Sequence, residues 1–197
     1  MRFKIPQKLI IVPVALAISI FGGGAILLPK STSIVGDSIP QVIEVKKVEI
    51  GVPVRLRIPT INVDSAFEYV GVAPDGTMAV PVGPDNVGWY KFGPRPGEAG
   101  SSVVAGHFGW KNNIPAVFDD LSKLQEGDKI YVEDENEQII IFVVRSIKEY
   151  NANSDASGVF GSADRKAHLN LVTCEGKWNE VSESRPKRRV VFTDRVE

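Results

Sequence analysis

The chain has 197 residues, of which 43% are hydrophobic and 24% charged, and its formal net charge is -1. This mixture excludes an intrinsically disordered chain, and the near-zero net charge provides no field that would attract nucleic acid. The length suits one ordinary domain with an additional segment, and 18 glycines and 13 prolines between short apolar runs favour an all-β domain over a helical bundle.

The additional segment is expected at the N-terminus. Arg2, Lys4 and Lys8 precede an uncharged run, Leu9–Pro29, which as a helix would span about 31 Å, close to the thickness of a bilayer core. The run is too long for the apolar region of a cleaved signal peptide. We therefore predict that residues 1–30 form a basic cytoplasmic tip and a single transmembrane signal anchor, with the remaining chain on the extracellular side.

Residues 31–50 are polar and lack a helical period, and they are interpreted as an extracellular stalk. The sequence predicts one β-rich domain over residues 51–197, because short runs of Val, Ile, Phe and Tyr alternate there with turn sequences such as "APDGT". The acidic stretch 133–138 is expected to be a hairpin turn, since it lacks the spacing of a calcium loop. The strand-like runs are 52–63, 67–72, 78–82, 101–110, 129–150, 168–174 and 188–194.

One segment, residues 114–130, is predicted to contain helical turns. Val117, Phe118, Leu121 and Leu124 have helical spacing there, and Gly127 follows as a stop signal.

Cys174 is the only cysteine, and it ends a strand-like run. A domain outside the cell lies where disulfides are permitted, yet this one can form none internally. An accessible thiol in that place is open to oxidation, which favours a nucleophile over an inert residue, although a buried and unreactive cysteine is the alternative.

A cysteine nucleophile requires a neighbouring base, and the chain has two histidines. His168 precedes Cys174 in the same predicted strand, and six residues of strand separate two side chains by about 20 Å, which excludes a direct contact. His107 ends another predicted strand, and the ends of adjacent strands can meet. We therefore favour His107 as the partner of Cys174.

Acyl transfer also requires a group that stabilises an oxyanion. Arg185, Arg188 and Arg189 follow Cys174, and a strand beginning at Arg188 would return antiparallel to the cysteine strand. Alternation places Arg188 and Arg189 on opposite faces, but the neighbouring residues on both faces are apolar. The pattern alone therefore leaves both arginines open.

Four motifs in order, "VVAGHFGW", "AVFDDLSKLQEGDKIYV", "LNLVTC" and "KRRVVF", resemble the sortases, the cysteine transpeptidases of Gram-positive cell surfaces. The resemblance extends from Ile58 to Thr193 and implies an eight-stranded β-barrel with short helices, preceded by one N-terminal transmembrane helix. It implies catalytic roles for His107, Cys174 and Arg188, with Arg189 as the second choice.

The family motif around the cysteine reads Thr-Leu-any-Thr-Cys, and here Asn170 replaces its first threonine. The matching Thr173 is expected to contribute to substrate binding. The resemblance further implies a non-housekeeping class of sortase, no cofactor and no metal.

The resemblance implies that Cys174 cleaves an LPXTG-like sorting signal through a thioester and transfers the surface protein to an amine. The expected partners are proteins that carry this signal and an acceptor such as a cell-wall precursor or a pilin lysine. Another wall transpeptidase or a cysteine peptidase of different fold is an enzymatic alternative, but L,D-transpeptidases carry His-Gly before their cysteine, where this chain has Val172-Thr173. A catalytically silent, membrane-anchored β-domain that binds a wall polymer or a surface partner is the alternative from another class.

Overall fold

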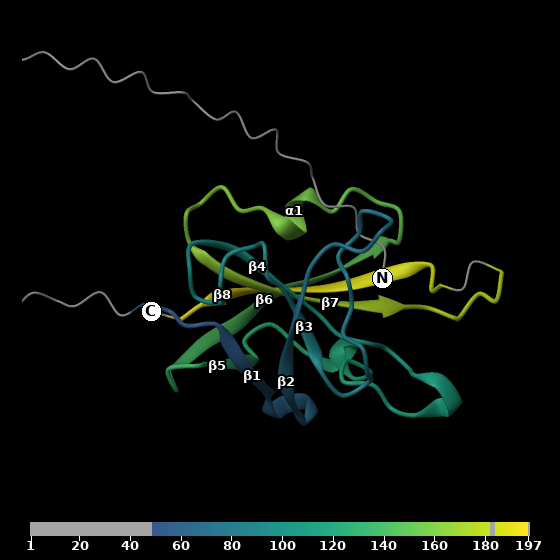
Figure 1. Ribbon diagram of the computed structural model, residues 1–197, viewed down its shortest axis with the longest axis horizontal. Coiled ribbons are helices and arrows are strands. Elements are labelled where there is room, and N and C mark those ends of the chain that lie inside the picture. The colour runs from purple at the N-terminus through teal and green to yellow at the C-terminus, as the bar shows by residue number, and fades with distance from the viewer. Residues whose placement is uncertain (1–48, 182–183, 197) are drawn as a thin grey trace, which may run out of the picture. The chain divides into compact units, whose positions relative to one another are not determined.

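The strands β1 to β8 form a closed barrel (Figure 1). Their order around the barrel is β1-β2-β3-β4-β7-β8-β6-β5, and β5 pairs with β1 to close it. This computed structural model describes residues 49–181 and 184–196. The pairs β2/β3 and β4/β7 are parallel and the others antiparallel. The strands are β1 Pro53–Ile58, β2 Val63–Val70, β3 Val87–Tyr90, β4 Gly100–Ala105, β5 Lys129–Asp134, β6 Ile139–Asn151, β7 Ala167–Glu175 and β8 Lys187–Arg195.

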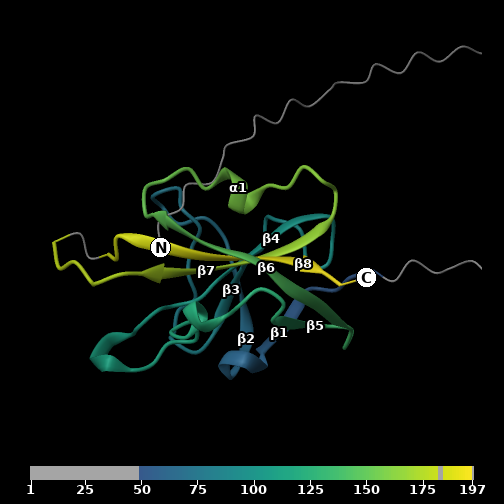
Figure 2. The ribbon, with the colours of Figure 1, turned by 180° about the vertical axis from the view of Figure 1, so that it is seen from behind.

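Strands β4, β7 and β8 are covered on both faces, which explains their continuous apolar sequences. Their inward residues, such as Leu171 and Val191, belong to the barrel core. Their outward residues, such as Val172 and Val190, pack beneath the short helix α1, Ser157–Phe160, which lies over these strands in both ribbon views (Figures 1 and 2). Burial on both faces is the reason why periodicity could not distinguish Arg188 from Arg189.

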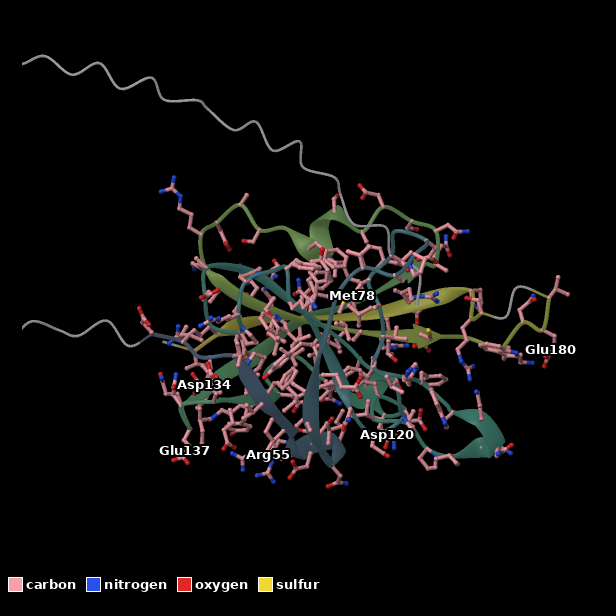
Figure 3. The ribbon with its side chains drawn as sticks, viewed as in Figure 1. Arg55, Met78, Asp120, Asp134, Glu137 and Glu180 are labelled. Carbon is pink, nitrogen blue, oxygen red and sulfur yellow. The ribbon has the colours of Figure 1, made fainter. Side chains whose placement is uncertain are left out.

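The all-β prediction is confirmed, and so is the hairpin turn within 133–138. Asp134 holds this turn, because its carboxylate accepts the backbone N–H groups of Gly51, Asn136 and Gln138. Figure 3 shows Glu137 projecting away from the barrel at the tip.

The prediction of helical turns within 114–130 is confirmed, and the turns are of the 3-10 type. Phe118, Leu121 and Leu124 are buried, and the segment forms successive turns with bonds between residues three apart, including the short 3-10 helix Leu121–Lys123. Asp119 stabilises these turns by accepting the N–H groups of Gly109 and Ala116. Apolar side chains therefore reach the core from a tighter turn than an α-helix. The other 3-10 helices are Pro59–Ile61 and Lys111–Asn113.

The run 78–82 is not a strand, contrary to the sequence prediction. Met78 forms only an isolated bridge with Val72. Beyond it, the carbonyl of Pro81 and the N–H of Val82 bind the side chains of other residues instead of a neighbouring strand. The β-strand lies further along the chain, at Val87–Tyr90.

The predicted membrane anchor, Leu9–Pro29, and most of the predicted stalk lie outside the described residues. Among the residues that the structure describes, no helix has the length and apolar character needed to cross a membrane.

Candidate functional site

Cys174 and Arg188 face each other across two antiparallel strands. Cys174 is the second-last residue of β7, Arg188 is the second residue of β8, and the register pairs them directly. Directly paired residues in an antiparallel ladder have side chains on the same face, with their Cβ atoms about 4.5–5.5 Å apart. The register therefore places the side chains of Cys174 and Arg188 next to each other on one face, and β7 and β8 run side by side in both ribbon views (Figures 1 and 2).

His107 lies just beyond the end of the neighbouring parallel strand β4. Ala105 pairs with Val172, and the N–H of Gly106 continues the ladder by donating to the Val172 carbonyl at 3.0 Å. The paired register ends at Ala105, and continuing it for two more residues would bring His107 level with Cys174. Alternation assigns Cys174 to the outward face of β7, which it shares with Val172, and the same alternation continued past Ala105 would assign His107 to that face.

Arg188 is fully buried, and it is the largest side chain of the described residues in that state. Its Nη1 group donates hydrogen bonds to the carbonyls of Arg185 and Lys187, at 2.8 and 2.7 Å. These bonds fix the guanidinium at the start of β8, on the strand that pairs with Cys174. A buried cation held in this way is suited to bind a developing negative charge.

Arg189 has a different environment. Its register partner is Thr173, and its guanidinium donates to Glu175 at 2.5 Å and to Glu149 at 2.9 Å. These two carboxylates compensate its charge on the face opposite to Cys174. The structure therefore brings Arg188, and not Arg189, to the cysteine.

The imidazole of His107 is half-buried and oriented by a backbone carbonyl. Its Nε2 lies 2.9 Å from the oxygen of Pro81, and since a carbonyl oxygen only accepts, Nε2 carries the proton and Nδ1 has the lone pair. The ring also packs edge-on against Trp110, with 4.7 Å between centroids. Burial lowers the pKa of His107 below its usual value, so the imidazole is neutral at neutral pH.

Thr173 is buried, and its hydroxyl donates to the carbonyl of Gly106 at 2.8 Å. This bond joins the residue before Cys174 to the residue before His107. Gly106 itself has no room for a side chain, because an added Cβ would lie 2.3 Å from the ring of Phe118. Close packing therefore fixes the turn that carries His107, and Thr173 binds this turn from β7.

Arg185 connects the segment after His107 with the segment after Cys174. Its guanidinium stacks on the ring of Phe108, 4.8 Å from the centroid, and donates to the carbonyl of Gly176. Its own carbonyl accepts the bond from Arg188. Arg185 therefore links the segment that follows His107 to the segment that follows Cys174. The sequence alone indicated only that Arg185 belongs to a basic cluster.

His168 lies away from these residues, near the start of β7, where it pairs with Ser101 of β4 and Asp194 of β8. Its ring nitrogens bind Asp194 at 2.8 Å and Asp164 at 2.9 Å. Strand β7 continues unbroken from Ala167 to Glu175, so the assumption behind the exclusion of His168 holds.

The bond between His107 and Pro81 could not be predicted from the sequence. A backbone carbonyl has no signature of its own, and Pro81 lies in a run that resembled a strand. The described parts of the chain contain no group of three or more His, Cys, Asp or Glu side chains that could hold a metal ion.

Comparisons with known proteins agree with this architecture. Residues 56–196 match the family model of the sortase domain. Sortase C-1 from Actinomyces oris is similar in structure, with 22% identity, a TM-score of 0.58 and 73% of each chain covered. Sortase A from Corynebacterium diphtheriae has 23% identity and a TM-score of 0.57, over 77% of this chain and 63% of that one. Streptococcus pneumoniae sortase C has 18% identity and a TM-score of 0.58, over 76% of this chain and 69% of that one. The comparison with curated proteins returned no match.

Proposed function

Given that this chain belongs to the sortase family, we propose that it is a cysteine transpeptidase that cleaves an LPXTG-like sorting signal and transfers the protein to an amine. The direct pairing of Cys174 with Arg188, at the strand ends where His107 also lies, carries this proposal. The catalytic roles of these three residues are part of it. The solved relatives include both sortase A and sortase C, so the non-housekeeping class also belongs to the proposal.

Acylation of Cys174 begins the proposed reaction. The sulfur attacks the carbonyl carbon between Thr and Gly of the signal, and the thiol proton moves to Nδ1 of His107. Arg188 holds the resulting oxyanion. When the tetrahedral intermediate collapses, the C–N bond breaks, the leaving amine takes the proton from His107, and a thioester remains on Cys174.

The second half returns the enzyme to its first state. An incoming amine attacks the thioester and loses a proton to His107, and the sulfur leaves as the thiol when the new amide forms. The neutral imidazole favoured by burial suits this cycle, because His107 starts each half as a base and ends it as an acid.

Thr173 was expected to bind substrate. Its hydroxyl is engaged with Gly106 in the described state, which supports a positioning role that fixes the turn before His107. Direct contact between Thr173 and the signal stays a prediction.

The proposed setting is a single-pass membrane protein whose catalytic domain lies outside the cell. Its partners would be surface proteins with the sorting signal, and its acceptor a cell-wall precursor or a pilin lysine. The alternative is a silent surface domain with an unreactive cysteine. Cys174 is only partly buried, which favours a reactive thiol.

The experiment that tests this function mixes the purified protein with a library of sorting-signal peptides and a small amine, and identifies products by mass spectrometry. The proposal predicts peptides cleaved after threonine and joined to the amine. Their absence with every peptide, together with a thiol that a labelling reagent cannot reach, would favour the silent domain.

A further inference from the structure

One peptide unit, between Pro81 and Val82, lies between the candidate histidine and a carboxylate. Its carbonyl accepts the Nε2–H of His107 at 2.9 Å, and its N–H donates to Oε2 of Glu68 at 2.9 Å. The other oxygen of Glu68 accepts the side-chain amide of Asn86 at 3.0 Å. Glu68 belongs to β2 and thus connects the second strand of the barrel with His107.

The two hydrogen bonds on this peptide strengthen each other. A carboxylate at the N–H increases the negative charge on the carbonyl oxygen of the same peptide, and such cooperative effects amount to about 10–30% per bond. A more negative oxygen binds the Nε2–H more strongly, and most strongly when the ring is an imidazolium. In a catalytic triad an acid binds the histidine directly and stabilises its imidazolium form. Here Glu68 takes the place of that acid, but a peptide group lies between it and His107.

We propose that Glu68 is a positioning residue that acts on His107 through the Pro81–Val82 peptide. It fixes the imidazole with its proton on Nε2 and its lone pair on Nδ1, and it stabilises the imidazolium that forms when Nδ1 takes the thiol proton. This role rests on the proposed function only for its effect on catalysis. The orientation and charge of His107 are properties of the folded protein itself.

The charges around His107 allow the direction of the effect to be derived. Burial lowers the pKa of His107 most, whereas the hydrogen bond to Pro81 and the charge of Glu68 act in the opposite direction. Other charged groups contact the segment after His107. Lys111 lies over Trp110, Arg185 lies over Phe108, and Asp119 binds the N–H of Gly109. Because a Glu68→Gln substitution leaves these groups in place, its effect can be assigned to the lost carboxylate.

The test compares Glu68→Gln with a matched control, Glu135→Gln. Both glutamates accept a backbone N–H through their side chains. Glu135 lies in the β5–β6 turn and accepts the N–H of Val52, which precedes β1, so it makes no bond to the Pro81–Val82 peptide. Glutamine can still accept the Val82 N–H, so the substitution removes the charge and retains the bond. The pKa of His107 in the full-length protein is measured by NMR, with His168 as an internal reference.

We expect Glu68→Gln to lower the pKa of His107 by about half a unit. The effect is small because one peptide group separates the carboxylate from the imidazole, and the imidazole is partly exposed. His168 and the Glu135→Gln control should be unchanged. The maximal acylation rate should fall about threefold, the factor that half a pKa unit represents, with KM unchanged. An unchanged pKa of His107 in a folded Glu68→Gln protein overturns the proposal, and so does an equal shift in the control. If the pKa shifts but no peptide is processed, the positioning role stands and the proposed function fails.

Discussion

Replacing Arg188 with lysine tests the arrangement of the site most sharply, because it keeps the charge and removes the geometry. Nη1 of Arg188 bonds two carbonyls at 2.8 and 2.7 Å, and the side chain is fully buried opposite Cys174. A lysine ammonium offers no planar fork, so it cannot hold these carbonyls and also direct a second donor to the oxyanion. Losing one such donor costs about 10²–10³ in rate. We expect a loss of this order in acylation.

The matched control is Arg189→Lys, one residue along the same strand. Arg189 is held by Glu175 and Glu149 on the other face, and partly exposed ion pairs of this kind contribute about 1 kcal/mol or less to stability. We expect a small loss in unfolding free energy and a change in acylation rate of only a few-fold, since the arginine that faces the thiol is intact.

The assay for both variants is single-turnover acylation by a sorting-signal peptide, followed by mass spectrometry, with circular dichroism to verify folding. A strongly reduced acylation rate in Arg189→Lys, together with an unchanged rate in Arg188→Lys, would refute the reasoning from strand register.

Three further predictions concern other parts of the chain. His107→Ala should lose nearly all acylation while His168→Ala keeps most of it, and the opposite ranking would contradict the assignment of the base. Burial lowers the pKa of His168, but the hydrogen bonds and charges of Asp164 and Asp194 outweigh burial and raise the pKa above its usual value. The stabilisation by His168 should therefore be full below about pH 6.5, its unfolded value, and be lost as pH rises through the higher folded pKa. Thermal unfolding of wild type and His168→Gln should accordingly differ more at pH 6 than at pH 9, and an equal difference would contradict the role of the two aspartates. Finally, the full-length chain should stay with membranes through high-salt and carbonate washes, whereas a form starting near residue 51 should be soluble, and release of the full-length chain by carbonate would contradict the anchor at Leu9–Pro29.

Much of the fold could be predicted from the sequence, because strand-forming residues and turn residues alternate along the chain. The return of β8 along β7 followed from the spacing after Cys174, and strand length alone separated His168 from the thiol. Both features depend on local geometry, which a sequence encodes directly.

The parts that could not be predicted depend on contacts between distant segments. The choice between Arg188 and Arg189 needed the register of β7 against β8, because both faces of these strands are buried. The segment 114–130 forms 3-10 turns and no α-helix, and Asp119 ties these turns to Gly109, a contact that apolar spacing does not reveal. The link from Glu68 to His107 passes through a backbone peptide, for which no sequence signal exists.

The central claim is that Cys174 becomes acylated by a sorting signal. Mass spectrometry of the intact protein after incubation with a sorting-signal peptide, without an added amine, tests this claim most directly, with Cys174→Ala as the control. We expect a mass increase equal to the peptide fragment that ends in threonine, mapped to Cys174, sensitive to hydroxylamine and absent in a folded Cys174→Ala protein. Cleavage of the peptide by the Cys174→Ala protein, or an adduct on any other residue, would contradict the account.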